Sequence, residues 1–302
     1  SIWDLASLTK PMAVTSYFMR AIASGDASLA DPVAGGAFTL GELLGHRSGL
    51  PAWDDLIGWL DATYPGWTPG DPETRVRIEA RILSLPRGPK TAVYSDLGYI
   101  LLGWHIEART GLSLDQLIPG FGVAPADGAR AMPTGWCPHR ERSLSAEVHD
   151  PNTWALGGVA GHAGMFGTLD DVGRWALALA RSDAGEDTDF DSETVRMFWS
   201  PDVRADGATW VLGFDTPTPG ASLAGSRISA NAVGHYGFTG VSVWIDRTRG
   251  RVVVLLTNRS ALGDAAKPNI KRFRPWFHDR VFASLDGEAL TLSPAVTGEI
   301  ND

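Results

Sequence analysis

Helical and strand-like segments are separated along this 302-residue chain, and this separation is what most constrains its fold. Apolar residues recur at helical spacing through the first two thirds, for example on one face of the stretch 7–24. Short β-rich runs follow only after about residue 210. Helices and strands segregated in this way are typical of the α+β class. The sequence therefore predicts an antiparallel sheet flanked by helices, together with a mainly helical part.

Spacing and caps place the individual elements. Two capping boxes, Thr39 with Glu42 and Thr168 with Asp171, each predict the start of a helix. The stretch 53–71, rich in Trp, Pro and Gly, is predicted to be an ordered surface loop. The other main predicted helices and strands are helices 7–24, 75–85, 95–109 and 269–285, the last kinked at Pro275, and strands 210–214, 232–236, 241–245 and 251–257, with a hairpin turn at 246–250.

We expect one domain over residues 1–302, with a mainly helical part at about 7–205 and the sheet and closing helix at about 206–287. The continuous apolar run 252–256 predicts a strand that is buried on both faces, and such a strand is usually paired at both edges. The strand at 241–245 supplies one neighbour, and the sequence offers no second one. We therefore expect that the N-terminal strands of the fold are missing from this chain and precede it.

Composition and charge exclude several classes of function. The chain is 44% hydrophobic and 20% charged with a net charge of -9, which is typical of a globular protein without a nucleic-acid partner. The only partly basic stretch, 271–274, is interrupted by apolar residues and is predicted to be one face of the terminal helix. No apolar run reaches the roughly 20 residues that a membrane-spanning helix needs, so we expect no membrane span.

The single cysteine, Cys137, cannot form an internal disulfide or a cysteine-based metal cage. It lies near His139 in loop-like sequence, which makes it a weak candidate nucleophile. The two-histidine helical spacing of zinc enzymes is absent from the sequence. These residues therefore predict no zinc site.

Ser7 and Lys10 are the first candidate reaction pair. Residues three apart on a helix share a face, and a buried amine can accept the proton of a neighbouring serine hydroxyl. The chain has only four lysines, and the pair lies in the first turn of a predicted helix, where unpaired amide N–H groups can bind an oxyanion. A serine cap followed by a solvated lysine is the alternative interpretation.

Tyr94, Ser95 and Asp96 open the predicted helix 95–109. A tyrosine phenol beside an ammonium group loses its proton more easily and can act as a base. Asp96 can orient the amine or accept a substrate N–H. Alternatively, Ser95 or Asp96 only caps the helix and Tyr94 only packs.

His235 and Gly237 lie at the end of an apolar predicted strand. The glycine allows a ligand to approach the backbone, and the next amide, that of Phe238, is a candidate oxyanion donor. His235 can bind a substrate acid group or adjust the base. A satisfied structural histidine is the alternative.

Together the three segments resemble the serine β-lactamase and penicillin-binding-protein superfamily, on its class C β-lactamase and esterase branch. Ser7-Leu8-Thr9-Lys10 matches the Ser-x-x-Lys element of that family. The other two segments, Tyr94–Asp96 and His235–Gly237, match its Tyr-x-Asn and Lys/His-x-Gly elements. The resemblance extends over most of residues 2–280 and includes the stretches 43–51, 147–152 and 155–164.

The resemblance implies a β-lactamase/transpeptidase-like fold and a single catalytic domain that hydrolyses acyl compounds through an acyl-enzyme. By this resemblance Ser7 is the nucleophile, and Lys10 and Tyr94 share the role of general base. The N–H groups of Ser7 and Phe238 form the oxyanion hole, and His235 lines the pocket beside Gly237. The resemblance implies neither a metal nor an organic cofactor. The family also has a strand pair before its Ser-x-x-Lys helix, in agreement with the expected missing strands.

Two departures from the family pattern bear on the substrate. Asp96 replaces an asparagine, which removes an N–H donor, and His235 replaces a lysine, which weakens the grip on a substrate carboxylate. Both favour hydrolysis of small esters or amides. A D-Ala-D-Ala-type peptidase or weak β-lactamase is the alternative enzyme, and a ligand-binding protein on the same scaffold is the non-enzyme alternative. We expect a small ester, amide or β-lactam as ligand and favour a periplasmic or secreted location over the cytoplasm.

Overall fold

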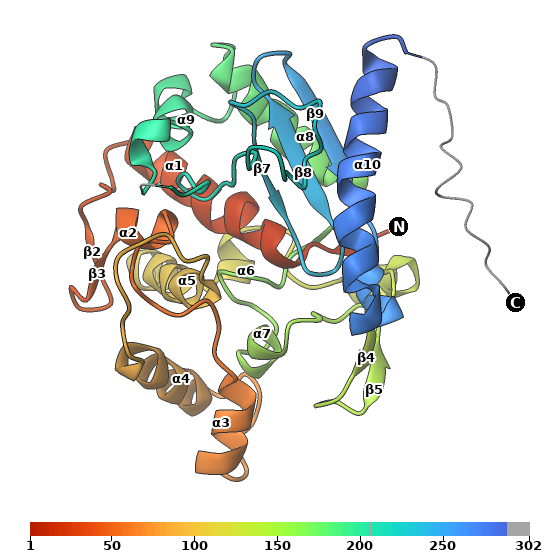
Figure 1. Cartoon of the computed structure of the whole chain (residues 1–302). Helices are drawn as coiled ribbons and strands as arrows, with labels where there is room; N and C mark the ends of the chain where they lie inside the picture. Colours follow the sequence, from red (N-terminus) through yellow and green to blue (C-terminus); the bar gives the residue numbers. More distant parts are fainter. Residues whose placement is uncertain (206, 289–302) are drawn as a thin grey trace, which may run out of the picture.

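The computed structural model describes residues 1–205 and 207–288, and its elements keep the predicted order, with helices first and the main sheet last (Figure 1). Residue 206 and residues 289–302, which the single-domain prediction includes, lie outside the described part. The α-helices are α1 Ser16–Ala23, α2 Leu40–Leu44, α3 Leu56–Thr63, α4 Pro72–Ser84, α5 Asp96–Thr110, α6 Leu114–Leu117, α7 Pro151–Ala155, α8 Leu169–Asp183, α9 Ser192–Phe198 and α10 Lys267–Leu285. The strands are β1 Trp3–Asp4, β2 Pro32–Val33, β3 Phe38–Thr39, β4 Gly135–Cys137, β5 Arg142–Leu144, β6 Phe166–Gly167, β7 Val233–Tyr236, β8 Ser242–Asp246 and β9 Arg251–Leu255.

The main sheet is antiparallel, in the order β7-β8-β9. Asp246 pairs with Arg251, which confirms the predicted hairpin. Helix α8 packs against β8 and β9. From the other side, α10 reaches the sheet through a contact of 3.1 Å between His278 Nε2 and Ser242 Oγ (Figure 1). The predicted α+β class, with an antiparallel sheet flanked by helices, is confirmed.

In the described part of the chain β9 pairs only with β8, so no second partner strand is present there, as the sequence indicates. The prediction that both faces of this strand are buried is only partly correct, because Val253 is buried while Val252 and Val254 are half-buried. An apolar groove runs along the strand, lined also by Leu177 of α8 and Phe277 of α10.

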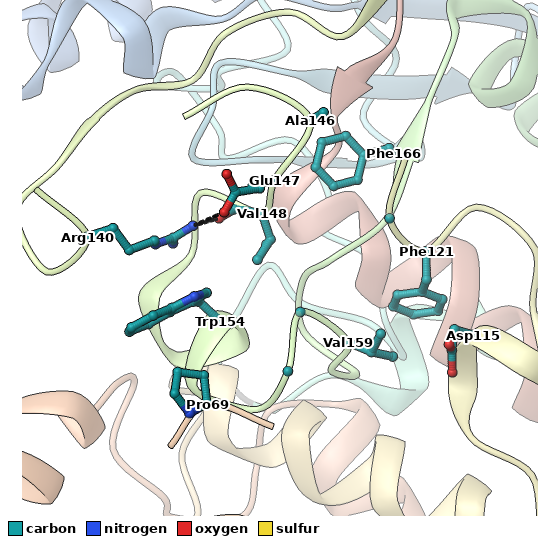
Figure 2. A pocket seen from close by; sticks show the side chains of 13 residues that line it. Pro69, Asp115, Phe121, Arg140, Ala146, Glu147, Val148, Trp154, Val159 and Phe166 are labelled. Atoms are coloured by element: carbon teal, nitrogen blue, oxygen red, sulfur yellow. Dashed lines mark hydrogen bonds and ion pairs between the residues drawn. The ribbon is translucent and has the colours of Figure 1, made fainter. Parts of the chain in front are cut away.

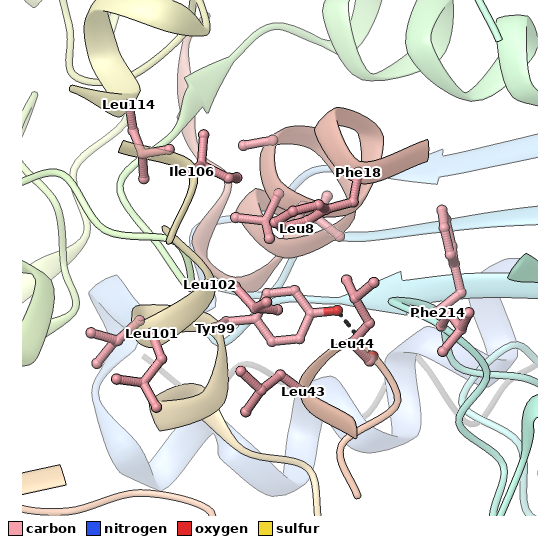
Figure 3. Packing of buried hydrophobic residues seen from close by; sticks show 14 of the residues in the cluster. Leu8, Phe18, Leu43, Leu44, Tyr99, Leu101, Leu102, Ile106, Leu114 and Phe214 are labelled. Carbon is pink, nitrogen blue, oxygen red and sulfur yellow. Dashed lines mark hydrogen bonds between the residues drawn. The ribbon is translucent and has the colours of Figure 1, made fainter. Parts of the chain in front are cut away.

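The predicted helix 7–24 is helical but changes type along its length. A 3₁₀ turn, Ala6–Leu8, carries Ser7, a π-helical segment, Lys10–Thr15, follows, and α1 completes the element before Gly25. Wide π turns occur mostly at functional sites, where they re-aim side chains. The element packs into the main hydrophobic core, which Figure 3 shows around Leu8, Phe18, Leu44, Tyr99 and Phe214.

Several predicted helix boundaries are close to the observed ones. Both capping boxes are present, at the starts of α2 and α8. Ser95 caps α5 through the amide of Gly98, and Gly111 ends that helix in the left-handed conformation that glycine tolerates best. Helix α4 starts three residues before its predicted start, because Asp71 caps it and Pro72 suits the first helical position.

Two predictions are wrong. The stretch 53–71 contains helix α3, capped by Asp55 and held by the buried side chains of Leu56 and Leu60. The stretch 210–214 is not a strand: Gly213 has φ +78°, and the Val211 amide bonds the Phe214 carbonyl across a tight turn. Its apolar residues are buried within the core rather than in a sheet. No helix in residues 1–205 and 207–288 has the length and apolarity to cross a membrane.

Candidate active site

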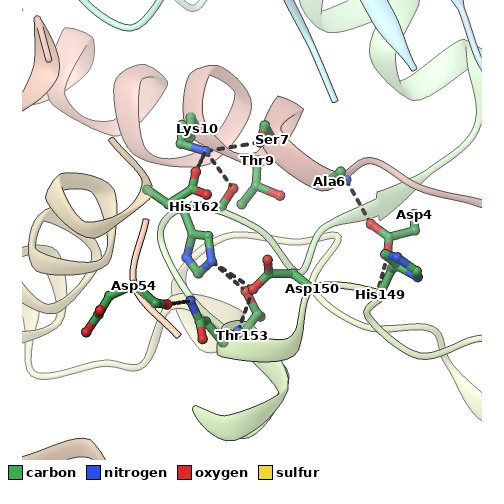
Figure 4. A network of polar contacts seen from close by, with 12 residues as sticks. Asp4, Ala6, Ser7, Thr9, Lys10, Asp54, His149, Asp150, Thr153 and His162 are labelled. Carbon is green, nitrogen blue, oxygen red and sulfur yellow. Dashed lines mark hydrogen bonds and ion pairs between the residues drawn. The ribbon is translucent and has the colours of Figure 1, made fainter. Parts of the chain in front are cut away.

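The amine of Lys10 contacts residues of both the first and the second predicted segment. Its Nζ lies 3.1 Å from Ser7 Oγ, 2.7 Å from the Tyr94 hydroxyl and 2.6 Å from Asp96 Oδ1. It also lies 3.3 Å from the carbonyl oxygen of His162 (Figure 4). The Lys10 side chain is fully buried, whereas that of Asp96 is 19% exposed. The alternative of a solvated lysine is therefore excluded.

A short strand pair fixes the backbone just before Ser7. Strand β1 pairs with β6, and Asp4 Oδ1 accepts the amide of Ala6 at 2.8 Å. Ala6 has φ +45°, a left-handed conformation that costs energy for a residue other than glycine. The other Asp4 oxygen accepts the amide of His149 at 2.7 Å. Burial raises the pKa of Asp4 to about 6, although both amides favour its charged form.

The third predicted segment lies against the same backbone. A Cβ on Gly237 would come within 2.9 Å of the Leu5 carbonyl oxygen and 3.0 Å of Ala6 Cβ, so only glycine fits there. Thr239 Oγ1 donates to the Asp4 carbonyl at 2.8 Å. In the hydrogen bonds of the described residues, the N–H of Phe238 has no acceptor. The contacts of Gly237 and Thr239 thus place the free N–H of Phe238 near the start of the turn that contains Ser7.

Tyr94 lies in a cage of rings, with ring centroids 4.8 Å from His46, 4.9 Å from Trp210 and 5.9 Å from His235. Burial, and then the charge of Asp96, raise the pKa of Tyr94 well above its usual value. This direction opposes the expectation that Lys10 makes the phenol easier to deprotonate, and the expected role of Tyr94 as a base stays a prediction. Tyr94 rests as a neutral phenol.

His235 is 1% exposed, and its Nδ1 lies 3.0 Å from the Tyr236 carbonyl oxygen. Burial, and then the charge of Lys10, lower its pKa to about 3. The neutral, enclosed ring packs behind Tyr94 and presents no charge, which argues against binding of a substrate acid group, and that expected role of His235 stays a prediction.

Two histidines of the site were not among the predicted site residues. His46 is 2% exposed, packs against Tyr94 with the two rings tilted by 48°, and accepts a hydrogen bond from the Ser95 amide at Nδ1. The ring of His162 lies under Lys10, with its Nε2 2.9 Å from Asp150 Oδ1 (Figure 4). Both lie in stretches that carry the family resemblance, 43–51 and 155–164, but neither stretch has a period or spacing that identifies a role.

The Asp150–His162 pair forms a second polar layer beneath the reaction centre. Burial alone would raise the pKa of Asp150, but His162 and Thr153 together hold it well below its usual range. Because the His162 carbonyl also contacts Lys10, this layer fixes the position of the amine from below. Within residues 1–205 and 207–288 no group of three His, Cys, Asp or Glu side chains could hold a metal ion.

A hollow of about 460 Å³ opens between the segments 146–148 and 157–159 (Figure 2). Arg140 lies on one wall, where it donates to the carbonyls of Val148 and His149 and faces the ring of Trp154. Residues 147–148 line the hollow, and the next residue, His149, donates its amide to Asp4. Ser7, Lys10 and Tyr94 are not among the residues that line it.

Several known proteins are similar to this chain in sequence or in fold. The "Putative D-alanyl-D-alanine carboxypeptidase" of Escherichia coli (strain K12) is 27% identical, over 94% of this chain and 77% of that protein. A β-lactamase structure from Mycobacterium bovis superposes with a TM-score of 0.59 at 18% identity, over 94% of this chain and 87% of the other. A structure described as "a hydrolase with promiscuous acyltransferase activity" gives a TM-score of 0.62 at 18% identity, over 91% and 84% of the two chains. The two structural matches support the same fold.

The family model described as Beta-lactamase matches residues 1–274, which include all three segments of the site. With its Ser-x-x-Lys pair in contact and the fold that carries it, this chain belongs to the β-lactamase family of serine hydrolases.

Proposed function

We propose that this protein hydrolyses small esters or amides through an acyl-enzyme on Ser7, with esters as the leading substrate class. The observation that carries the proposal is the position of Lys10 Nζ, within hydrogen-bond distance of both Ser7 Oγ and the Tyr94 hydroxyl. A serine alcohol is a weak nucleophile until a neighbouring base removes its proton. The geometry supports that role for Lys10. The described residues would act as one catalytic domain.

In the proposed mechanism Asp96 acts together with Lys10 as the general base. An ammonium group 2.6 Å from a carboxylate cannot accept the Ser7 proton unless it gives up its own. In the proposed step Ser7 transfers its proton to Lys10 as Lys10 passes a proton to Asp96. The Ser7 Oγ–carbon bond forms, and the carbonyl electron pair moves onto the substrate oxygen. The Lys10–Asp96 pair thus gains the proton that the serine loses.

Tyr94 acts in the proposed mechanism as the acid for the leaving group. Its raised pKa keeps the phenol protonated, and a proton on the leaving oxygen or nitrogen allows the carbon–leaving-group bond to break. Lys10, 2.7 Å away, then returns a proton to the phenolate, so the serine proton ends on the released alcohol or amine. In the second half of the reaction water attacks the acyl-enzyme carbonyl in place of Ser7. The protons then move along the same groups in the reverse direction and Ser7 is released.

The developing oxyanion needs fixed donors. The N–H of Phe238 has no acceptor among the described residues, and the Gly237–Thr239 turn is bonded to the backbone that precedes Ser7. Together with the N–H of Ser7 it would form the oxyanion hole. Preorganised donors of this kind account for a large share of the rate in acyl transfer.

A D-Ala-D-Ala-type peptidase is the second candidate. The name of the Escherichia coli relative favours it, and its 27% identity extends over nearly the whole chain. The site itself favours esters, because Asp96 offers no N–H to a substrate amide carbonyl and His235 presents no charge to a substrate carboxylate.

The test is a rapid-mixing assay with p-nitrophenyl acetate. We expect a burst of one p-nitrophenolate per enzyme, followed by slower turnover, and loss of the burst in Ser7→Ala. A ligand-binding protein would give no burst in either form. Parallel assays with a D-alanyl-D-alanine peptide and with nitrocefin rank the substrate classes. Faster turnover of the peptide than of the ester would replace the esterase assignment by the peptidase one.

A further inference from the structure

Arg274 of α10 is a buried cation whose partners are backbone carbonyls. Its residue is 5% exposed, and Nη2 donates to the Gly237 carbonyl at 2.6 Å and to the Val241 carbonyl at 2.9 Å. Buried charges are normally paired with an opposite charge. Within residues 1–205 and 207–288 no carboxylate lies within ion-pair distance of Arg274, whose guanidinium carbon lies 5.2 Å from the centre of the Tyr236 ring.

The Gly237 carbonyl belongs to the peptide group that ends in the N–H of Phe238. A charge-assisted bond to a peptide oxygen draws electron density from the nitrogen and makes its N–H a stronger donor. Arg274 therefore acts on the far end of the group that the proposed mechanism places at the substrate oxyanion.

A second buried guanidinium holds the next peptide group. Arg259 is 7% exposed, donates to the carbonyl of Phe238 and lies 4.4 Å from the centre of the Phe238 ring. The carbonyls on both sides of the Phe238 amide are thus held by arginines. Arg274 comes from the terminal helix and Arg259 from the 3₁₀ turn Arg259–Leu262.

The side chain one turn after Arg274 on α10 adds no positive charge beside the guanidinium. One turn later, His278 contacts Ser242 of β8, the residue that pairs with Tyr236 of β7. Burial, and then Arg274, lower the pKa of His278 to about 4, so its ring is neutral and does not repel the guanidinium. Helix α10 is thus fixed to the strand pair by one neutral and one charged side chain.

We propose that Arg274 is a positioning residue for acyl transfer, which orients and polarises the Gly237–Phe238 peptide so that the Phe238 N–H stabilises the oxyanion. The inference rests on the proposed acyl-enzyme function. In this proposal Arg274 affects catalysis without touching the substrate. The sequence predicted Arg274 only as part of one face of the terminal helix.

The test compares Arg274→Met and Arg274→Lys with Arg272→Met, a control on the exposed side of the same helix that removes a guanidinium bonded to Asn269. Acylation rates and KM are measured with p-nitrophenyl acetate. Infrared spectra of the carbonyl-¹³C acetyl-enzyme report the strength of hydrogen bonding to the acyl oxygen. Circular dichroism and thermal unfolding establish that each variant is folded.

We expect Arg274→Met to acylate about tenfold more slowly with KM within about threefold of wild type, because a weakened oxyanion donor acts on the transition state. Its acyl carbonyl band should move to higher wavenumber. Arg274→Lys, which keeps the charge, should recover most of the rate and the band position, and Arg272→Met should match wild type. If Arg274→Met does not fold, Arg274→Gln is measured instead and should show the same loss.

A folded Arg274→Met or Arg274→Gln enzyme with the wild-type rate and band position overturns the inference. So does an equal loss in the methionine and lysine variants with an unmoved band, which would indicate only a structural role. A wild-type protein that forms no acyl-enzyme contradicts the proposed function itself, and the two failures are therefore distinct.

Discussion

The ammonium of Lys10, which is fully buried, and the partly exposed carboxylate of Asp96 form an ion pair with an N–O distance of 2.6 Å, next to a serine hydroxyl. In the Tyr-x-Asn pattern that the sequence resembles, an asparagine stands at the position of Asp96. In the proposed mechanism Lys10 is not the base alone, because a neighbouring carboxylate stabilises its positive charge. We therefore predict that proton transfer in this site follows a different route from that in a site with asparagine at position 96.

Replacing Asp96 by asparagine therefore tests the proton route. We expect Asp96→Asn to lower kcat for p-nitrophenyl acetate about 10²-fold with little change in KM, because the final proton acceptor is lost. The measurement is steady-state kinetics beside Asp170→Asn, an exposed control on α8. Wild-type kcat in Asp96→Asn would show that Lys10 and Tyr94 suffice without the carboxylate.

His235 should make the protein sensitive to acid. Its folded-state pKa of about 3 lies below the ordinary value of 6.5, so the neutral ring contributes stability that is fully present above pH 6.5. That contribution is lost as the pH falls from 6.5 towards 3, by up to about 5 kcal/mol at 1.36 kcal/mol per pKa unit. In urea unfolding we expect His235→Gln to lose less stability than wild type between pH 7.5 and pH 4.5.

The matched control for this measurement is His139→Gln, since His139 is exposed. It should follow the wild-type pH dependence. Parallel curves for wild type and His235→Gln would contradict the assignment of a buried neutral ring behind Tyr94.

Much of the fold follows from the sequence because helix periodicity and caps are local signals. Ser95, Gly111 and the two capping boxes act within one turn of chain, and all are observed. The failed predictions depend on non-local burial. Leu212 is buried by the surrounding core rather than by a sheet, and the helix at Leu56 was obscured by the Trp, Pro and Gly residues around it.

The contacts of the candidate site were predictable only in part. Ser7 and Lys10 meet because they are three residues apart, which sequence shows directly. The electrostatics were not predictable, since the raised pKa of Tyr94 and the lowered pKa of His235 depend on burial by distant segments. Arg274 was missed for the same reason: its carbonyl partners, Gly237 and Val241, are more than thirty residues away.

The close approach of Gly237 to the strained turn at Ala6 predicts a strong effect of one methyl group. A Cβ on Gly237 would lie 2.7 Å from Val241 Cγ2 and 2.9 Å from the Leu5 carbonyl oxygen. We expect Gly237→Ala to cost about 2 kcal/mol of unfolding free energy and to lower acylation, because the Phe238 amide is displaced.

Gly173→Ala is the control for that variant. Gly173 lies in α8, and a Cβ there would meet no atom within 4 Å, so alanine should be neutral or slightly stabilising. Urea unfolding and burst kinetics measure both variants. Equal stability and equal burst rates in the two would contradict the close packing of the Gly237 turn on the segment before Ser7.

The most direct test of the central claim is intact-mass analysis of the protein after treatment with a fluorophosphonate, followed by peptide mapping. The account predicts one covalent adduct per chain on Ser7, and no adduct in folded Ser7→Ala. An adduct on another residue, or no adduct on a folded wild-type protein, would contradict the claim that Ser7, Lys10 and Tyr94 form a reaction centre.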